Sequence, residues 1–166
     1  MPTRLSTGAG GKRPFLHATG AVFLFLLGRA MYDARTGMFA AFGYALMPAV
    51  ILSSAVISTD GVLMPFWCAG LYAFWRLRSG EGRWASAVGL GVAVGAGFLS
   101  KYAMLYFLIG IGLTLVLDRD TRKALVSWQG LATMLVAAVI FAPHLAWNAA
   151  NDFKTVSHTV DNANLG

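Results

Sequence analysis

Long apolar blocks separated by short polar links dominate this 166-residue sequence. A helix needs roughly 20 mostly apolar residues to cross a ~30 Å hydrocarbon core, and several of the blocks approach that length. Helices are the expected form, because the open edge of a sheet cannot be satisfied in lipid. The candidate spans are residues 15–28, 38–57, 61–75, 84–100, 102–117 and 124–147. We therefore predict an all-α, polytopic transmembrane helical bundle of about six spans.

The composition excludes other classes of protein. Hydrophobic residues make up 57% and charged residues 12% of the chain, whereas a soluble domain carries roughly 45–50% and 25%. A disordered chain would need low hydrophobicity and high charge, and the single cysteine, Cys68, excludes a disulfide scaffold. The net charge of +6 is spread over links between apolar blocks. We therefore predict a lipid bilayer, and no nucleic acid, as the partner of this chain.

Lys101 divides the longest apolar run, residues 84–117, near its middle. A lysine at the centre of the membrane would cost about 2.5–3.5 kcal/mol on the insertion scale. A turn that places Lys101 at the membrane surface avoids this cost. The run is therefore predicted to form two spans rather than one long helix.

The basic residues predict the orientation of the spans. Cytoplasmic links are enriched in Lys and Arg, and three alternate links hold Arg29, Arg35, Arg76, Arg78, Arg83, Arg119, Arg122 and Lys123. Residues 58–61, residues 100–102 and the segment after Trp147 then lie on the outer face. The predicted organisation is a flexible tail at 1–13, a transmembrane domain at 14–148 and the start of an outer loop at 149–166. The basic residues of the tail run against the rule.

Three side chains at the predicted outer face have both a structural and a functional interpretation. A carboxylate such as Asp60 between apolar blocks is costly unless it is solvated, paired or functional, and it could also cap the following helix. Lys101 could extend its ammonium to the surface or bind an anionic phosphate, and it could pair with Asp60. His144 follows Pro143 and is either a polar residue at a helix end or part of a site.

Four glycines and the single cysteine are predicted to serve helix packing. Gly91 and Gly95 lie four residues apart, so they predict a close approach of two helix backbones, and Gly110 and Gly112 predict the same. Cys68 is predicted to be an ordinary packing residue. The histidines lack the spacing of metal ligands, so no metal site is predicted from them.

Three segments together resemble a known family. Residues 58–61 (Ser-Thr-Asp-Gly) enter an apolar block, residues 97–102 (Gly-Phe-Leu-Ser-Lys-Tyr) form the second segment, and residues 143–153 contain Ala-Trp-Asn-Ala and Asp-Phe. In order and spacing they resemble bacterial glycosyltransferase family 39, the relatives of protein O-mannosyltransferases and of the aminoarabinose transferase that modifies lipid A. The resemblance covers residues 15–166 and implies a partial GT-C membrane domain.

The resemblance implies an enzyme of the cell inner membrane that takes a sugar from a polyprenyl-phosphate carrier. The sugar passes to a hydroxyl of a lipid, glycan or protein at the outer face. By similarity Asp60 is the catalytic carboxylate, which can accept the proton of the acceptor hydroxyl. Substrate-binding roles are implied for Lys101, Tyr102, His144 and Asn148, where a cation can stabilise the departing phosphate. The sugar, the acceptor, the metal dependence and the oligomeric state stay open.

One difference from the family pattern leaves two alternative functions open. Its members carry an acidic pair in a large outer loop near the N-terminus, whereas the first acidic residue here is Asp33, in a predicted cytoplasmic link. We therefore expect a piece of a longer enzyme, and an inactive remnant is one alternative. A transporter segment is the other, although transporters place polar sites near the midplane and the polar residues here gather at one face.

Overall fold

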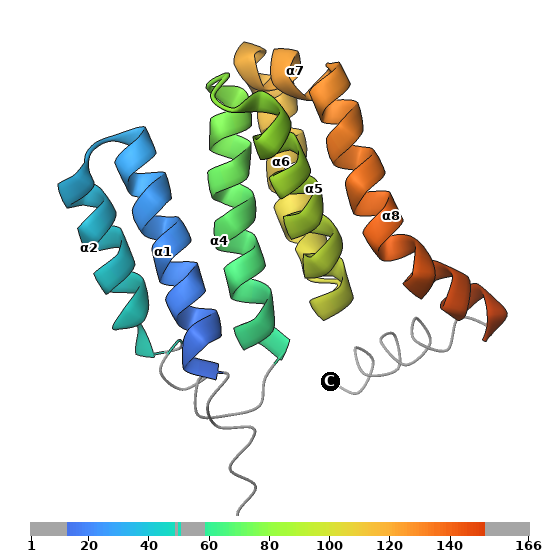
Figure 1. Cartoon of the computed structure of the whole chain (residues 1–166), viewed down its shortest axis with the longest axis horizontal. Coiled ribbons are helices and arrows are strands. Elements are labelled where there is room, and N and C mark those ends of the chain that lie inside the picture. The colour runs from blue at the N-terminus through green and yellow to red at the C-terminus, as the bar shows by residue number, and fades with distance from the viewer. Residues whose placement is uncertain (1–12, 49, 51–58, 152–166) are drawn as a thin grey trace, which may run out of the picture.

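The computed structural model describes residues 13–48, 50 and 59–151, with side chains for 16–48, 50 and 61–151. All regular secondary structure in this part of the chain is helical (Figure 1), which confirms the predicted all-α class. The helices are α1 (Arg13–Met31), α2 (Ala34–Ala45), α4 (Thr59–Arg78), α5 (Arg83–Ser100), α6 (Met104–Leu117), α7 (Arg119–Leu125) and α8 (Trp128–Ala150).

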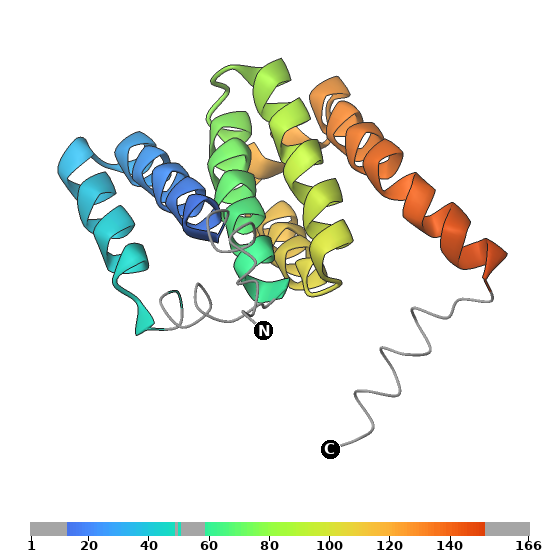
Figure 2. The same ribbon diagram turned by 60° about the horizontal axis from the view of Figure 1, so that its bottom comes forward.

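The helices form a row in which each packs against the next. The order is α2, α1, α4, α5 and α8, and Figure 2 shows this row from a second direction. The core lies where α4, α5 and α6 meet, around Leu63, Leu77, Leu90, Met104 and Phe107. Burial of such large apolar side chains is the main force that holds helices together in water, and close packing takes over this role in lipid.

The helix ends divide into two groups. The α1–α2 link, the α4–α5 link and α7 lie together at one end of the bundle (Figure 1). The basic residues that predicted the orientation lie there, in the helix turns that border the two links and in α7. The start of α4, the α5–α6 turn and the last turn of α8 lie at the other end. We call these the α7 end and the turn end.

The predicted break at Lys101 is confirmed. Helix α5 ends at Ser100, and Lys101 is extended, with φ −164° and ψ 136°. Its backbone N–H still donates to the carbonyl of Gly97 at 2.9 Å. Helix α6 starts three residues later, at Met104, so the run 84–117 forms two helices.

Two other predicted boundaries were wrong, because polar caps start helices that hydropathy alone does not reveal. Asp33 accepts a hydrogen bond from the Thr36 N–H at 2.7 Å, so α2 starts at Ala34 and not at residue 38. Helix α2 ends at Ala45, before Pro48, and residues 49 and 51–57 of that predicted span lie outside the described residues. The predicted span 124–147 is divided between α7 and α8, because Ser127 caps α8.

The glycine prediction was right on α5 and wrong on α6. A Cβ atom at Gly91 would lie 2.7 Å from the carbonyl oxygen of Thr133, and one at Gly95 would lie 2.8 Å from the Cβ of Ile140. These two glycines therefore let α5 and α8 touch backbone to backbone. Around Gly110 and Gly112 there is open space instead. Cys68 is buried and unpaired, as predicted.

Two helices of the described part, α5 and α8, are long and apolar enough to cross a membrane. Residues 16–31 and helix α6 form shorter apolar helices. Much of this apolar surface faces outward: Val139 of α8 and Val116 of α6 are each 70% exposed. The bundle therefore has the apolar exterior that a hydrocarbon environment would match.

Candidate functional site

Three predicted site residues meet at the turn end. The Tyr102 hydroxyl lies 2.8 Å from His144 Nε2, and Asn148 Nδ2 lies 3.3 Å from both the hydroxyl and Nε2. His144 and Asn148 are four residues apart on α8, so they lie on the same face of the helix. Tyr102 comes from the α5–α6 turn, which the break at Lys101 creates. We call these three residues the Tyr-His-Asn cluster.

The cluster is partly buried and is not saturated, because Tyr102 and His144 are half-buried and only Asn148 is fully buried. Asn148 is 2% exposed, and its Oδ1 atom is buried without a hydrogen-bond partner among the described residues. A buried amide oxygen without a partner costs about 1–3 kcal/mol, and in the described part only two other side-chain atoms, Trp67 Nε1 and Arg76 Nε, are buried in this way. The cluster therefore offers an unused acceptor.

The Tyr102 hydroxyl joins the two side chains of α8. It accepts from Asn148 Nδ2, which can only donate, and it bonds to His144 Nε2 as donor or acceptor according to the tautomer of the imidazole. In the tautomer that carries its hydrogen on Nδ1, the imidazole can donate from that atom to an oxygen of a substrate. The ring also packs against Phe141, with 5.3 Å between centroids.

The other two predicted site residues, Lys101 and Asp60, lie at the same end of the bundle. Lys101 directly precedes Tyr102 and is exposed at the same turn. Asp60 is the second residue of α4, at the turn end. The side chain of Asp60 lies outside the described side chains, so the predicted pairing of Asp60 with Lys101 stays a prediction.

An apolar groove that the sequence reasoning did not identify runs beside the cluster. It has a volume of about 600 Å³ and lies between α5, α6 and α8. Phe141 and Leu145, next to His144 on α8, line one part of it, and Phe98 stacks on Phe141 with 5.4 Å between ring centroids. Each of these helices is apolar on nearly every face, so hydropathy could not indicate which faces line a groove.

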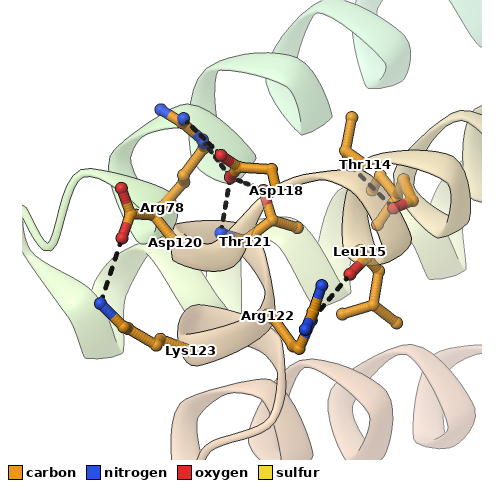
Figure 3. Close-up of polar contacts among 9 residues, drawn as sticks. Arg78, Thr114, Leu115, Asp118, Asp120, Thr121, Arg122 and Lys123 are labelled. Atoms are coloured by element: carbon orange, nitrogen blue, oxygen red, sulfur yellow. Dashed lines mark hydrogen bonds and ion pairs between the residues drawn. The ribbon is translucent and has the colours of Figure 1, made fainter.

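The α7 end holds an ion-paired cluster of a different kind. Arg78 donates two hydrogen bonds to Asp118, of 2.8 and 3.0 Å. Asp118 also accepts from the backbone N–H and the hydroxyl of Thr121, at 2.8 and 2.7 Å (Figure 3). These donors, Arg78 first, hold the pKa of the Asp118 carboxyl well below its usual range. The cluster joins α4 to α7, so Arg78 is more than the orientation signal that the sequence suggested.

Two basic residues that served as orientation signals also have structural contacts. Arg122 donates to the carbonyl oxygens of Leu115 and Val116, at 3.3 and 2.8 Å, so its charge lies at the C-terminal end of α6. Arg83 donates to Gln129 Oε1 at 3.1 Å and ties α5 to α8. Among the described residues, no three His, Cys, Asp or Glu side chains gather where they could hold a metal ion.

The fold and the cluster define an apolar helical bundle with a polar site at one end. The family described as dolichyl-phosphate-mannose-protein mannosyltransferase matches residues 15–147. The chain is similar to the lipid A galacturonosyltransferase RgtD of Rhizobium johnstonii, with 32% identity over 148 residues. It is also similar to the lipopolysaccharide core galacturonosyltransferase RgtA of the same organism, with 33% identity over 81 residues. No solved structure matches the chain.

The chain belongs to this family, which confirms the resemblance to GT-C glycosyltransferases. The match to RgtD covers 89% of the chain and 31% of RgtD, and the match to RgtA covers 49% and 16%. The chain thus spans about a third of the length of RgtD. The family match covers the Tyr-His-Asn cluster except for Asn148, which lies one residue beyond it.

Proposed function

We propose that the chain forms part of a membrane-embedded glycosyltransferase of the inner membrane. It would transfer a sugar from a polyprenyl-phosphate carrier to a hydroxyl of a lipid, glycan or protein on the outer face. Family membership favours this function over a transporter segment. Because RgtD and RgtA are named for galacturonosyl transfer to lipid A and to the lipopolysaccharide core, a galacturonosyl donor and a glycolipid acceptor are the first substrates to test.

The membrane setting of this proposal is a multi-pass bundle of about six spans. Its support is the apolar length of α5 and α8 and the exposed apolar side chains of α6 and α8. The basic residues of the helix turns beside these links and of α7 gather at the α7 end, which by the positive-inside rule faces the cytoplasm. The turn end, with the Tyr-His-Asn cluster, then faces the outer side.

The observation that carries the proposal is the Tyr-His-Asn cluster with its unpaired Asn148 oxygen. The Nδ1–H of His144 and the ammonium of Lys101 suit oxygens of the carrier phosphate, and Asn148 Oδ1 suits a hydroxyl of a sugar. In the reaction, the acceptor oxygen bonds to C1 of the sugar as the bond from C1 to the phosphate oxygen breaks. Asp60 takes the proton of the acceptor, and Lys101 stabilises the negative charge on the leaving lipid phosphate.

Substitution at the two proposed charged positions tests the function. The full-length protein that contains this chain is expressed in membrane vesicles, and sugar transfer from a lipid-linked galacturonosyl donor to lipid A is measured. We expect Asp60→Asn and Lys101→Ala to lower transfer at least a hundredfold while the amount of inserted protein stays the same, because removal of a positioned acid–base or charge-stabilising group costs about 10²–10⁴ in rate.

Asp33→Asn is the matched control, because it also removes one carboxylate but keeps a capping side chain at the start of α2. It should transfer sugar at the wild-type rate. Transfer at that rate by both Asp60→Asn and Lys101→Ala would contradict the site. The orientation has its own test: a reporter fused after Asn164 should be active in the periplasm, and activity in the cytoplasm would reverse the topology.

A further inference from the structure

A basic concavity lies at the α7 end, away from the Tyr-His-Asn cluster. It has a volume of about 380 Å³ and is lined by Arg119, Arg122, Lys123 and Val126, all of them exposed. Asp118, the nearest carboxylate along the chain, is already bound to Arg78. The remaining acidic neighbour, Asp120, lies 3.4 Å from Lys123. Three cations therefore line one hollow beside a single carboxylate that could balance them, and Arg122 is held at its edge by the carbonyls of Leu115 and Val116.

This basic concavity adjoins the apolar groove between α5, α6 and α8. Val126 lines both hollows, and Leu125 and Gly130 continue the lining of the groove from that point. The groove then follows α8 through Met134 and Ala138. Thr133 is a polar residue of the lining. Its hydroxyl donates to the carbonyl of Ala87 at 3.0 Å, so it adds no unpaired polar group to the groove.

We propose that this continuous surface binds an anionic phospholipid. Its phosphate would lie among Arg119, Arg122 and Lys123, and an acyl chain would lie in the apolar groove. The inference rests on the proposed membrane setting, in which the α7 end meets the anionic cytoplasmic leaflet. Trp128 is the first residue of α8, three residues after the end of α7, and is 77% exposed. Exposed tryptophans at a helix end favour the level of the lipid headgroups.

The chemistry favours a lipid over inorganic phosphate. Three exposed cations at a water-filled surface hold a small anion weakly, because water and salt screen the attraction. An acyl chain in the groove adds contacts that grow with every buried methylene. A zwitterionic headgroup is disfavoured, because its own cation would lie beside the three basic side chains. This lipid is distinct from the sugar donor, whose phosphate we place at the turn end.

Lipid binding to the purified chain tests the headgroup part of the proposal. The chain, in a neutral detergent, is titrated with phosphatidylglycerol or phosphatidylcholine of equal acyl length, and native mass spectrometry counts the bound lipids. We expect one phosphatidylglycerol to be retained and phosphatidylcholine to bind at least tenfold more weakly. A basic residue near an anionic lipid is worth about fivefold in affinity. Arg119→Gln combined with Lys123→Gln should therefore weaken phosphatidylglycerol binding about 25-fold.

The matched control removes the same charge elsewhere at the same end. Arg29→Gln combined with Arg35→Gln changes two exposed basic residues that do not line the concavity. This pair should lower affinity less than threefold. An equal loss in both double variants would mean a diffuse electrostatic effect and would overturn the site, as would equal binding of the two lipids.

A second variant tests the groove. Ala138→Trp places a large ring in the groove from an exposed position on α8, so the helix content measured by circular dichroism should not change while phosphatidylglycerol binding falls at least tenfold. Unchanged binding, or displacement of the lipid by millimolar inorganic phosphate, would contradict the proposal. No sugar donor is present in these measurements, so their failure would leave the proposed transferase activity untouched.

Discussion

The two ends of the bundle use polar residues in opposite ways. At the α7 end, Asp118 accepts four hydrogen bonds from Arg78 and Thr121, and the pair is partly exposed, with side chains 29% and 31% accessible. At the turn end Asn148 is buried, and its amide oxygen has no partner among the described residues. A saturated cluster holds helices in place, whereas an unsaturated buried one has capacity for a ligand. The contrast is between the two clusters and not between the ends as a whole, because Arg76 Nε near the α7 end is also buried without a hydrogen-bond partner among the described residues.

The contact between α5 and α8 supports the turn end, so breaking it should have the largest effect. Gly91→Leu would place a side chain against the carbonyl of Thr133 and the Cβ of Val136, within 2.7 and 2.8 Å. Overpacking of this kind costs about 1–3 kcal/mol, and it would move the helix that carries His144. We expect a lower midpoint of thermal unfolding in detergent and the loss of sugar transfer in the full-length protein.

Gly110→Leu is the control for this prediction, because no atom of the described residues lies within 4 Å of a Cβ atom at Gly110. Leucine is a better helix former than glycine by about 0.8–1.0 kcal/mol, so this variant should unfold at the same temperature as the wild type or higher. Equal destabilisation by both variants would mean that α5 and α8 are not pressed together as described.

Removal of one member of the Tyr-His-Asn cluster should have the next largest effect. His144→Ala takes away the partner of the Tyr102 hydroxyl in a part-buried contact, and one such hydrogen bond contributes about 0.5–1.5 kcal/mol to stability. Sugar transfer by the full-length protein should fall about tenfold to a hundredfold, which corresponds to about 1.4–2.7 kcal/mol in the barrier, and the unfolding temperature should fall by less than in Gly91→Leu. Gln129→Ala removes a polar contact near the other end of the same helix and should leave transfer unchanged. A similar fall in both variants would remove the distinction between the two ends.

The sequence could predict the features that depend on the free energy or the size of a few neighbouring residues. The turn at Lys101 follows from the expense of a charge inside a membrane, and the close approach at Gly91 and Gly95 follows from small residues on one helix face. The division of residues 124–147 did not follow, because the break depends on the cap at Ser127 and not on hydropathy. Gly110 and Gly112 have the same local character as the α5 glycines but face open space, which only the position of the neighbouring helices decides.

The candidate site was predictable as a set of residues and not as a cluster. Tyr102 and His144 are 42 residues apart, and they meet because α8 packs along α5 and returns to the α5–α6 turn. The resemblance named Tyr102, His144 and Asn148 as substrate-binding, but it could not indicate that they bond to one another. Nor could it indicate the unpaired oxygen of Asn148, since that depends on what the neighbouring helices leave uncovered.

The pH dependence of stability should come from the α7 end. The pKa of the Asp118 carboxyl is lower in the folded chain than its usual value, chiefly because of the bonds from Arg78. Its stabilising effect is therefore complete above the unfolded pKa of about 3.9 and is lost as the pH falls from there toward the folded value. Asp118→Asn keeps the capping side chain of α7 but removes the charge. Its unfolding temperature should be lower than that of the wild type at pH 7 and should change less between pH 7 and pH 3. Parallel profiles would contradict the assignment.

The smallest effect should come from Asp120, two residues further along α7. It contacts Lys123 at 3.4 Å, but the side chains are 61% and 78% exposed, and an exposed pair of this spacing is worth only about 0.2–0.5 kcal/mol. Asp120→Asn should therefore leave the unfolding temperature unchanged within error, in contrast to Asp118→Asn on the same short helix.

The same substitution makes the basic concavity more positive. If Lys123 belongs to a lipid site, Asp120→Asn should bind phosphatidylglycerol more tightly, by about fivefold for the one charge removed, without any gain in stability. A gain in stability without tighter lipid binding would instead assign Lys123 to the packing of α7 alone.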